Sequence, residues 1–417
     1  MPMYLTPGVY VVEEPSGARP IEAVGTSTPA FVGVVDSPDG PVGEPVAINN
    51  WMQYLRVFPT TGPSSPLTLA VGGFFANGGK RCWVLNVGAG GTLTGTPRRP
   101  GLSALAEIDE IAIVAAPGFT DAASYEALLS HCEDLGDRVA ILDAPREVSD
   151  ITLLTKVGTA DTVAPAAPAA PRGGEGTDEG QESPPPAAAP SSTRRSAGLA
   201  PRPSSWGSFY FPHIRVVDPI AGGIVDAPPS GHIAGVWART DATRGVHKAP
   251  ANEPLRGAVD LTYRLTSAEQ GELNTAGVNA IRFFSTEGIK VWGARTLAGS
   301  SSEWRYLNVR RLFAMVEESI VRSTSWIVFE PNDQTLWNMI RRDISSFLER
   351  LYRQGALMGR TPEEAFFVKC DDETNPQSEI DAGVVTTLVG MAPVKPAEFI
   401  VFKVSQHSSG ASVEQEG

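Results

Sequence analysis

The apolar residues in the first part of the chain come in short continuous runs, with amphipathic segments between them. Residues 29–35, 81–87, 111–115 and 138–143 are four such runs, and residues 122–135, between the last two, have the pattern of a helix. Strands that helices cover on both faces are apolar along their whole length rather than at alternate positions. The order strand, helix, strand therefore predicts an α/β domain built on a parallel sheet.

Further elements of this domain follow from the same reasoning. Gly78-Gly79 marks the end of one helix, because glycine commonly ends helices. The segments expected to be helical are 51–58, 67–77 and 232–240, and those expected to be strands are 209–212, 214–218, 281–284 and 288–293.

A second unit is predicted to follow these elements. Its expected helices are 307–322 and 334–352, and its expected strands are Trp326–Glu330, Phe366–Cys370 and Val384–Gly390. The helix at 334–352 has one apolar stripe at helical spacing, which predicts that this face is buried in a core. The stripe consists of Leu336, Ile340, Ile344, Phe347, Leu348 and Leu351.

Residues 158–204 show neither the strand pattern nor the helix pattern. They are rich in Pro, Ala and Gly, as in Ala164–Pro168 and Ser183–Pro186. Such a composition cannot bury much apolar surface or hold regular hydrogen bonds. We expect a flexible or extended insertion that decorates the surface of the α/β domain.

The two ends of the chain have the pattern of β-strands, and neither has a hairpin partner nearby. The first covers residues 4–14 and the second covers residues 397–404. An unpaired strand invites association, so each end could complete a sheet in a neighbouring copy; alternatively, both pair within their own subunit. Gly17-Ala18 and Pro393–Pro396 could supply hinges. The residues expected to form exchanged strands are Tyr4, Val9, Tyr10, Val11, Val12, Phe399, Ile400, Val401, Phe402 and Val404.

The composition argues against several classes of partner. A formal charge of −13 and a pI near 5.0 disfavour a nucleic acid or an anionic membrane surface. We expect neither a signal peptide nor a membrane-inserted segment, because no basic region precedes an apolar run and no long apolar run occurs. The three cysteines, Cys82, Cys132 and Cys370, lie far apart, which predicts reduced core thiols in a cytoplasm.

Several short stretches follow one another in order along the chain, outside the insertion. They are Leu5–Tyr10 with Val24–Thr28 and Phe31–Gly33, Phe74–Gly79 followed by Cys82–Val84, Gly288–Leu297, Tyr306–Arg311, Phe329–Asn332 and Gly355–Leu357. Each stretch alone is weak, but their order is specific. Together they resemble the contractile tail-sheath family of phage tails, R-type pyocins and phage-tail-like contractile injection systems.

The resemblance implies a fold, a function and a set of partners. It implies a subtilisin-like α/β domain at 26–295, with the insertion at 158–204, and a smaller C-terminal α+β domain at 296–394 that faces an inner tube. Residues 1–25 and 395–417 would be exchange arms, so the resemblance favours strand exchange between subunits. The chain would assemble in the bacterial cytoplasm as a helical homopolymer around an inner tube protein, with baseplate and terminal cap proteins. Contraction would drive the tube into a target.

A subtilisin-like domain requires a search for catalytic residues. Gly25-Thr26-Ser27 precedes the first buried strand instead of opening a late helix, and no Asp or His motif accompanies it. Gly72–Arg81 departs from phosphate-loop spacing, and Asp371-Asp372-Glu373 lacks a second ligand group. We expect no catalytic, cofactor-binding or metal-binding residues. Two alternatives stay open: a cytoplasmic α/β hydrolase that its terminal strands dimerise, and a binding module that uses the Pro-rich insertion.

The helix at 334–352 also carries positive charge on its polar side, although the chain is acidic overall. Its basic residues are Arg341, Arg342, Arg350 and Arg353, which outnumber Asp343 and Glu349. Together with the resemblance, they predict a contact with an acidic inner tube. The alternative is an ordinary solvated surface with a local Glu349–Arg353 pair, worth about 0.3–0.5 kcal/mol.

Overall fold

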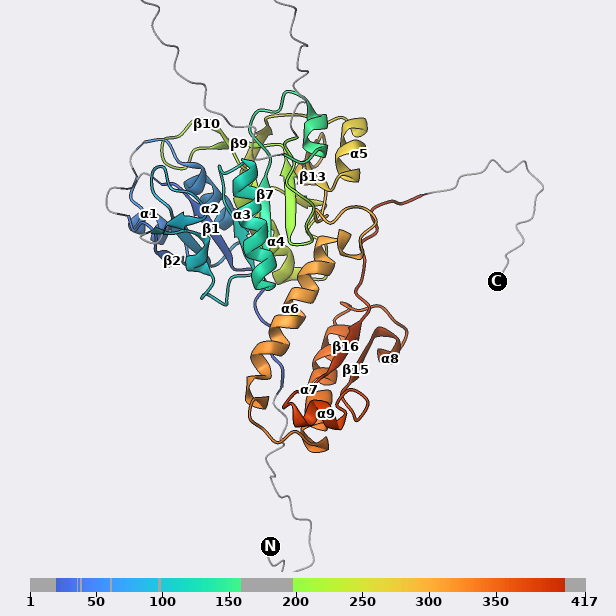
Figure 1. Cartoon of the computed structure of the whole chain (residues 1–417). Helices are drawn as coiled ribbons and strands as arrows, with labels where there is room; N and C mark the ends of the chain where they lie inside the picture. The colour runs from blue at the N-terminus through green and yellow to red at the C-terminus, as the bar shows by residue number, and fades with distance from the viewer. Residues whose placement is uncertain are drawn as a thin grey trace, which may run out of the picture.

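The computed structural model describes residues 20–401, except residues 36, 38, 39, 61, 97, 98 and 159–197. A large α/β domain and a smaller domain lie one above the other in Figure 1, and helix α6 (Leu307–Ser323) runs from the first into the second. Both ends of the described chain also lie at the junction between the domains. Residues 21–26 and 391–398 each have contacts in both domains.

The large domain is built on a nine-stranded sheet. Its strands are β1 (Pro29–Gly33), β2 (Pro45–Ile48), β3 (Cys82–Asn86), β6 (Ile113–Ala115), β7 (Val139–Asp143), β8 (Gly207–Phe211), β11 (Glu253–Pro254), β13 (Val278–Phe284) and β14 (Gly288–Val291). They are arranged in the order β11-β14-β13-β8-β7-β6-β1-β3-β2. The pairs from β13 to β3 are all parallel, and antiparallel strands flank them at both edges. The predicted α/β domain with a parallel sheet is confirmed.

Helices cover both faces of this sheet. They are α1 (Trp51–Val57), α2 (Pro66–Ala76), α3 (Ala122–Leu135), α4 (Ser230–Arg244) and α5 (Ser267–Thr275). In β1, Phe31 packs in the layer of α2 and α4, whereas Ala30 and Val32 pack in the layer of α3. Because successive side chains of a strand point to opposite faces, a strand between two helical layers has to be apolar throughout.

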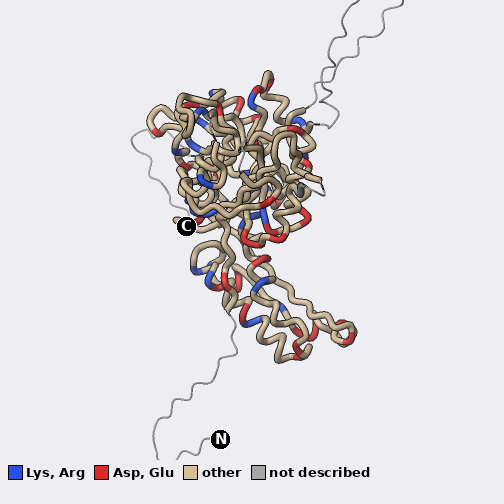
Figure 2. The backbone as a smooth tube through the Cα atoms, turned by 90° about the vertical axis from the view of Figure 1, so that its left-hand side faces the viewer, with Lys and Arg blue, Asp and Glu red and all other residues tan. Residues whose placement is uncertain are grey.

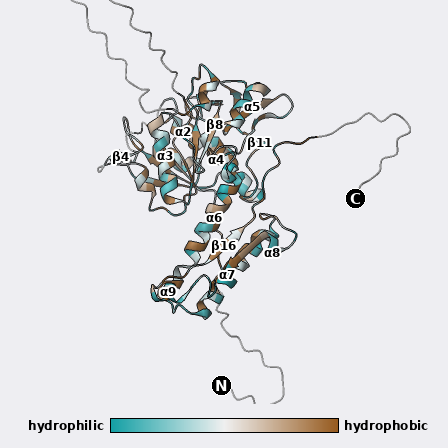
Figure 3. Ribbon diagram, turned by 45° about the vertical axis from the view of Figure 1, so that its right-hand side comes forward, coloured by the Kyte–Doolittle hydropathy of each residue, from teal (hydrophilic) through white to brown (hydrophobic). Residues whose placement is uncertain are grey.

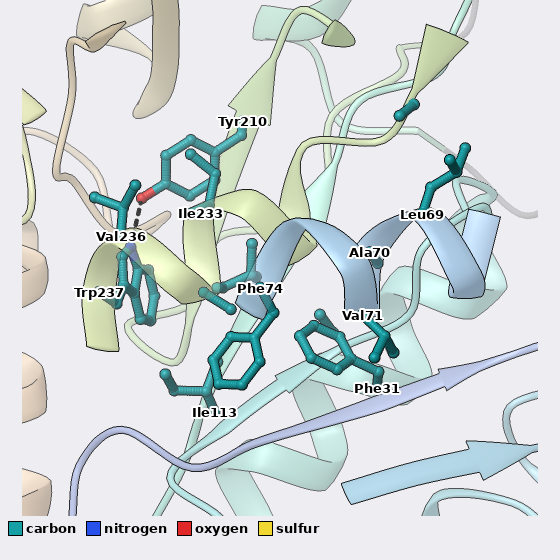
Figure 4. Packing of buried hydrophobic residues seen from close by; sticks show 14 of the residues in the cluster. Phe31, Leu69, Ala70, Val71, Phe74, Ile113, Tyr210, Ile233, Val236 and Trp237 are labelled. Carbon is teal, nitrogen blue, oxygen red and sulfur yellow. Dashed lines mark hydrogen bonds between the residues drawn. The ribbon is translucent and has the colours of Figure 1, made fainter. Parts of the chain in front are cut away.

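The layer of α2 and α4 is shown from close by in Figure 4. Phe31 and Phe74 meet edge to face with ring centroids 5.6 Å apart, and the Trp237 indole N–H donates to the Tyr210 hydroxyl over 3.2 Å. The two helices come very close together: a Cβ added at Gly73 would lie 2.1 Å from Nδ1 of His232. Gly73, in the segment Gly72–Arg81, therefore serves helix packing, and Gly78 (φ +107°) follows the end of α2.

Smaller elements complete the large domain. One three-stranded sheet has the order β10-β9-β12, with β9 (Ile214–Val217), β10 (Ile224–Ala227) and β12 (Ala258–Leu261), and a short hairpin pairs β4 (Gly95–Thr96) with β5 (Arg99–Pro100). The 3₁₀ turns are η1 (Leu102–Leu105), η2 (Ile151–Thr155) and η4 (Glu303–Arg305). In the part of the chain that the structure describes, no helix combines the length and apolarity needed to cross a membrane.

The small domain contains the lower part of α6, the helices α7 (Gln334–Arg353), α8 (Pro362–Ala365) and α9 (Gln377–Asp381), and the strands β15 (Phe366–Lys369) and β16 (Leu388–Met391). Its core confirms the predicted apolar stripe of α7, since all six residues are buried there. They pack against Leu312, Met315 and Val316 of α6 and against Ile21 of the N-terminal segment.

The strand predicted at Trp326–Glu330 is wrong. A 3₁₀ turn, η5 (Ser325–Ile327), follows α6, and Val328 and Phe329 lie in a loop with their side chains in solvent. Phe329 has φ +70°, which an extended strand does not allow. The run of aromatic and β-branched residues has strand propensity, but no described strand lies beside it to supply hydrogen bonds. The last predicted strand is also shorter than expected, because β16 begins only at Leu388.

Candidate assembly surfaces

The N-terminal segment is fixed to both domains. In the small domain, Ile21 is buried and its carbonyl accepts a hydrogen bond from Arg350 of α7. The Val24 amide donates to Ser319 Oγ of α6 over 3.0 Å. In the large domain, Thr26 Oγ1 donates to Asp241 Oδ2 over 2.6 Å. The described chain therefore begins at the small domain, beside α7.

Two consecutive arginines attach the start of α6 to the large domain. The Arg310 guanidinium lies between the rings of Trp206 and Trp304, at 4.1 and 4.3 Å from their centroids. Arg311 forms a buried ion pair with Asp241, with a 3.0 Å contact between Nη1 and Oδ1. These contacts fix the angle at which α6 enters the small domain.

The C-terminal segment returns from the small domain to the large one. The Val394 amide donates to the Ala356 carbonyl over 3.1 Å, and Asn308 of α6 donates to the Val394 carbonyl over 3.0 Å. Four residues further on, Glu398 pairs with Arg295 of the large domain. After this ion pair the segment has neither helix nor strand structure as far as Val401.

The predicted arm residues fall into two groups. Phe399, Ile400 and Val401 are described, and their exposed fractions are 75%, 74% and 78%. They extend away from the body in Figure 1. The other predicted arm residues lie outside the described residues; they are Tyr4, Val9, Tyr10, Val11, Val12, Phe402 and Val404.

The small domain presents a two-stranded sheet at its surface. β15 and β16 pair in antiparallel register, with Phe367 opposite Gly390 and Val368 opposite Val389. The Phe367 ring covers Gly390 but is itself 59% exposed, and Leu388 is 51% exposed. Figure 3 shows this hydrophobic strand pair on the outside of the small domain. A two-stranded sheet with an open apolar face is of marginal stability by itself.

The four arginines predicted to contact a tube are all on α7, and all four are exposed. Arg353 pairs with Glu349 over 2.5 Å, which confirms the expected local ion pair, and Arg342 pairs with Asp343 over 3.0 Å. Arg341 donates to Asn338 over 2.6 Å. Arg350 holds the Ile21 carbonyl, a role that the sequence did not indicate. Figure 2 shows acidic and basic residues interspersed on the small domain.

Ser230 and His232, at the start of α4, are both buried inside the large domain. Asp143, at the end of β7, accepts hydrogen bonds from the amide (2.8 Å) and hydroxyl (2.6 Å) of Ser230 at the start of α4. Burial raises the pKa of Asp143 to about 7 and lowers the pKa of His232 to about 4. His232 Nδ1 lacks a hydrogen-bond partner among the described residues. Nor do those residues include a group of three or more His, Cys, Asp or Glu placed to hold a metal.

Comparison with known proteins identifies the family. Residues 194–297 match the family model for the phage tail sheath protein central domain, and residues 300–407 match that for the phage tail sheath C-terminal domain. The chain is also similar over nearly its whole length to the PVC sheath complex of an extracellular contractile injection system in its contracted state. The match has a TM-score of 0.73 and 30% identity, and it covers 98% of this chain and 99% of that one. The chain belongs to the contractile tail-sheath family.

Two further sheath-related structures are similar in the same way. The helical sheath of the anti-feeding prophage in its contracted state matches with a TM-score of 0.72 and 31% identity, covering 97% of this chain and 100% of that chain. A chain of the anti-feeding prophage baseplate matches with a TM-score of 0.71 and 32% identity, with the same coverage. These sheath matches confirm the resemblance that the ordered stretches indicate.

Curated tail-sheath relatives match over a shorter region. The tail sheath protein of Vibrio phage KVP40 is 27% identical over 187 residues, which are 44% of this chain and 27% of that protein. The chain therefore spans only about a quarter of the length of this larger sheath protein. Most of the phage protein lies outside the matched region.

Proposed function

We propose that this chain is the structural sheath subunit of a contractile, phage-tail-like injection system. It polymerises helically around an inner tube, and contraction of the polymer drives the tube into a target. The observation that carries the proposal is the full-length similarity to contracted sheath subunits. Its role is mechanical, and it has no catalytic activity.

Subunits join by exchange of their terminal strands. The described start of the C-terminal arm, Phe399–Val401, is apolar and lies in solvent. Among the described residues β15 and β16 pair only with each other, and they expose Phe367 and Leu388. A peptide that adds a strand to such an edge gains main-chain hydrogen bonds, each worth about 1 kcal/mol net. We assign the edges of β15–β16 as the acceptor for the arms of neighbouring copies.

Such exchange has the geometry of an open assembly. An arm that leaves the body and joins a different surface of the next copy makes a heterologous contact, which generates a helix unless the rotation closes. Contraction then requires two arrangements of the same subunits, with the arms preserving the connections between them. A difference of a few kcal/mol per subunit, summed over the polymer, supplies mechanical work.

The small domain faces the inner tube through α7. Arg341, Arg342 and Arg353 are exposed and would meet acidic groups on the tube. Arg350 already donates to the Ile21 carbonyl, so a contact with the tube would come in addition to that hydrogen bond. Exposed ion pairs are weak, about 0–1 kcal/mol each, and salt screens them. Weak contacts suit a tube that has to be released when the sheath shortens.

The remaining features fit a particle component. Assembly takes place in the bacterial cytoplasm, and the baseplate and terminal cap proteins bind at the ends of the polymer. The large domain, with α4 buried beside its parallel sheet, corresponds to the subtilisin-like domain of the family, and the insertion lies on the outside of the cylinder. The similarity to a chain from a baseplate structure supports the baseplate contact.

Removal of the N-terminal arm tests the proposal. Deletion of residues 1–14 should leave a soluble, folded monomer, because the described contacts of the N-terminal segment begin only at Ile21. Negative-stain microscopy after co-expression with the tube protein should show striated cylinders for the full chain and small particles for the deletion. Cylinders from the deletion variant would refute strand exchange, and small particles from the full chain would favour the hydrolase alternative.

A further inference from the structure

The C-terminal segment has well-defined contacts up to Glu398 and none of the same kind at Phe399–Val401, where the described chain ends. Leu357 and Pro393 form an antiparallel bridge, and the Val394 amide donates to the Ala356 carbonyl over 3.1 Å. Asn308, which is 1% exposed, donates to the carbonyls of both Val394 (3.0 Å) and His247 (2.8 Å). The segment is therefore tied to the small domain, to α6 and, through Asn308, to the large domain.

Arg295 holds the far end of this segment. Its side chain is 6% exposed, and its guanidinium donates to both carboxylate oxygens of Glu398, with 2.9 Å between Nε and Oε1. It also donates to the Asn274 carbonyl over 2.8 Å, and its own amide donates to Asn279 Oδ1 over 2.7 Å. The guanidinium is thus positioned by the body of the large domain whether or not Glu398 is present.

Open space lies beside the segment from Val394 onward. Residues 394–400 line a groove of about 710 Å³ together with Arg244, Lys248 and Trp292. Since open space adjoins Lys395–Ala397, the ion pair at Glu398 is the contact that sets where the segment lies. Phe399 and the two residues after it are exposed.

We infer that the Arg295–Glu398 ion pair anchors the root of the C-terminal arm, so that the arm begins at Phe399. Residues 391–398 then form a fixed strap that ties the small domain to the large one. The hinge expected at Pro393–Pro396 lies between two positions that contacts hold in place, Val394 and Glu398, so these residues are part of the strap and not a hinge. What the arm does depends on the proposed function, but the anchor itself does not.

The anchor gives the two arms different origins. The described chain begins at the small domain, where Arg350 holds Ile21, whereas its C-terminal segment is last held by the large domain, at Arg295. A neighbour is reached correctly only if each origin is constant, because an exchanged strand has to match one register on the acceptor sheet. Arg295 and Glu398 are therefore positioning residues for assembly.

A pair of truncations separates the anchor from the arm. Removal of residues 399–417 keeps Glu398, and the melting temperature of the protein should stay within about 2 °C of that of the full chain. Removal of residues 395–417 leaves the buried Arg295 without its carboxylate and should lower the melting temperature by about 3 °C or more. Equal melting temperatures for the two truncations would overturn the anchor.

A point substitution in the full chain tests the same claim without truncation. In E398Q the Val394 amide should exchange with solvent about ten-fold faster, because the buried Arg295 charge loses its carboxylate partner and the strap can open. E398D retains the charge and should restore most of the protection, and E287Q, which removes the exposed Lys290–Glu287 pair, is the matched control. Unchanged Val394 exchange in E398Q would refute the anchor.

The outcomes for the anchor and for sheath assembly can be told apart. Sheath formation with co-expressed tube should fall several-fold in E398Q and remain in E287Q. If the full chain forms no sheath but the truncations and E398Q behave as expected, the anchor stands and the proposed function fails. If sheaths form normally and Val394 exchange is unaltered in E398Q, the proposed function stands and the anchor fails.

Discussion

Arg311 and Asp241 form an ion pair whose side chains are only 3% and 4% exposed, at the place where α6 leaves the large domain. Arg311 also lies 4.6 Å from the Trp237 ring centroid and donates to the Thr26 carbonyl over 3.0 Å. One guanidinium thus contacts the central helix α4, the N-terminal segment and a buried aromatic ring. Such a pair holds these elements in one arrangement. Removal of only one of its two charges lowers the stability strongly, because the other charge stays buried without a partner.

Asp241→Asn should therefore destabilise the protein strongly. The substitution leaves the buried Arg311 charge uncompensated, and the expected loss is about 3–5 kcal/mol in the free energy of unfolding. Chemical denaturation measures this loss. Glu349→Gln removes an exposed pair with Arg353 and should change the free energy by less than about 1 kcal/mol. Similar losses in the two variants would contradict a structural role for the buried pair.

Asp143 should make stability depend on pH. Burial raises its pKa in the folded protein to about 7, above the ordinary value of 3.8. A group with a raised folded-state pKa contributes its full stability below the unfolded pKa and loses it as pH rises through the folded value. Asp143→Asn lacks this ionisation. Between pH 4 and 8 the wild-type protein should thus lose up to about 4 kcal/mol relative to the variant. A constant difference across this range would show that the two Ser230 hydrogen bonds outweigh burial.

At the scale of elements, periodicity predicted most of the helices well. Residues 122–135 and 334–352 form α3 and α7 with the expected bounds to within one residue, because each has a clear apolar stripe and an Asp N-cap. The strand expected at 326–330 failed, since propensity alone cannot supply a neighbouring strand. Strand formation depends on pairing partners that a local window does not contain.

Only part of the candidate assembly surfaces could be predicted from the sequence. The apolar terminal residues and the basic side of α7 are local patterns, and they pointed to candidates directly. Arg295 and Glu398 are 103 positions apart, so no periodicity or spacing links them. Arg295 and Asn308 do lie within the sheath-like stretches Gly288–Leu297 and Tyr306–Arg311. Those stretches marked the positions but not the contacts.

The arginines of α7 provide a test at the scale of one element. Arg342→Glu combined with Arg353→Glu should weaken co-sedimentation of the sheath with its tube. Because Arg342 pairs with the buried Asp343, thermal unfolding of the variant has to be measured alongside binding. Binding of the wild-type sheath to the tube should also weaken as the salt concentration rises. Arg146→Glu, at an exposed position of the large domain, is the control. Undiminished co-sedimentation of the double variant would place the tube contact elsewhere.

At the scale of the whole molecule, three connections cross between the two domains. They are the N-terminal segment at 21–26, helix α6 and the C-terminal segment at 391–398, and each is fixed by contacts in both domains. A body held at three places resists bending at its junction. We therefore expect contraction to change the contacts between subunits while the two domains of one subunit keep their arrangement.

The insertion is the part of the chain that this body should be able to lose. Its two ends are held together: the Gly158 amide donates to the Ala200 carbonyl over 2.8 Å, and the Ala200 amide donates to the Lys156 carbonyl over 2.9 Å. Replacement of residues 159–197 by Gly-Ser-Gly should therefore leave the stems in place. Each halving of loop length lowers the entropic cost of closure by about 0.6 kcal/mol, so the melting temperature should stay the same or rise slightly.

This shortened chain should still form sheaths with the tube protein, and microscopy and thermal unfolding measure the two properties separately. Removal of residues 399–417 is the informative comparison, because it should preserve the fold while stopping assembly. A shortened chain that folds normally but forms no sheath would mean that residues 159–197 contact a neighbouring copy. In that case the insertion would belong to the lattice between subunits, and the outer surface of the cylinder would have to be assigned to another part of the large domain.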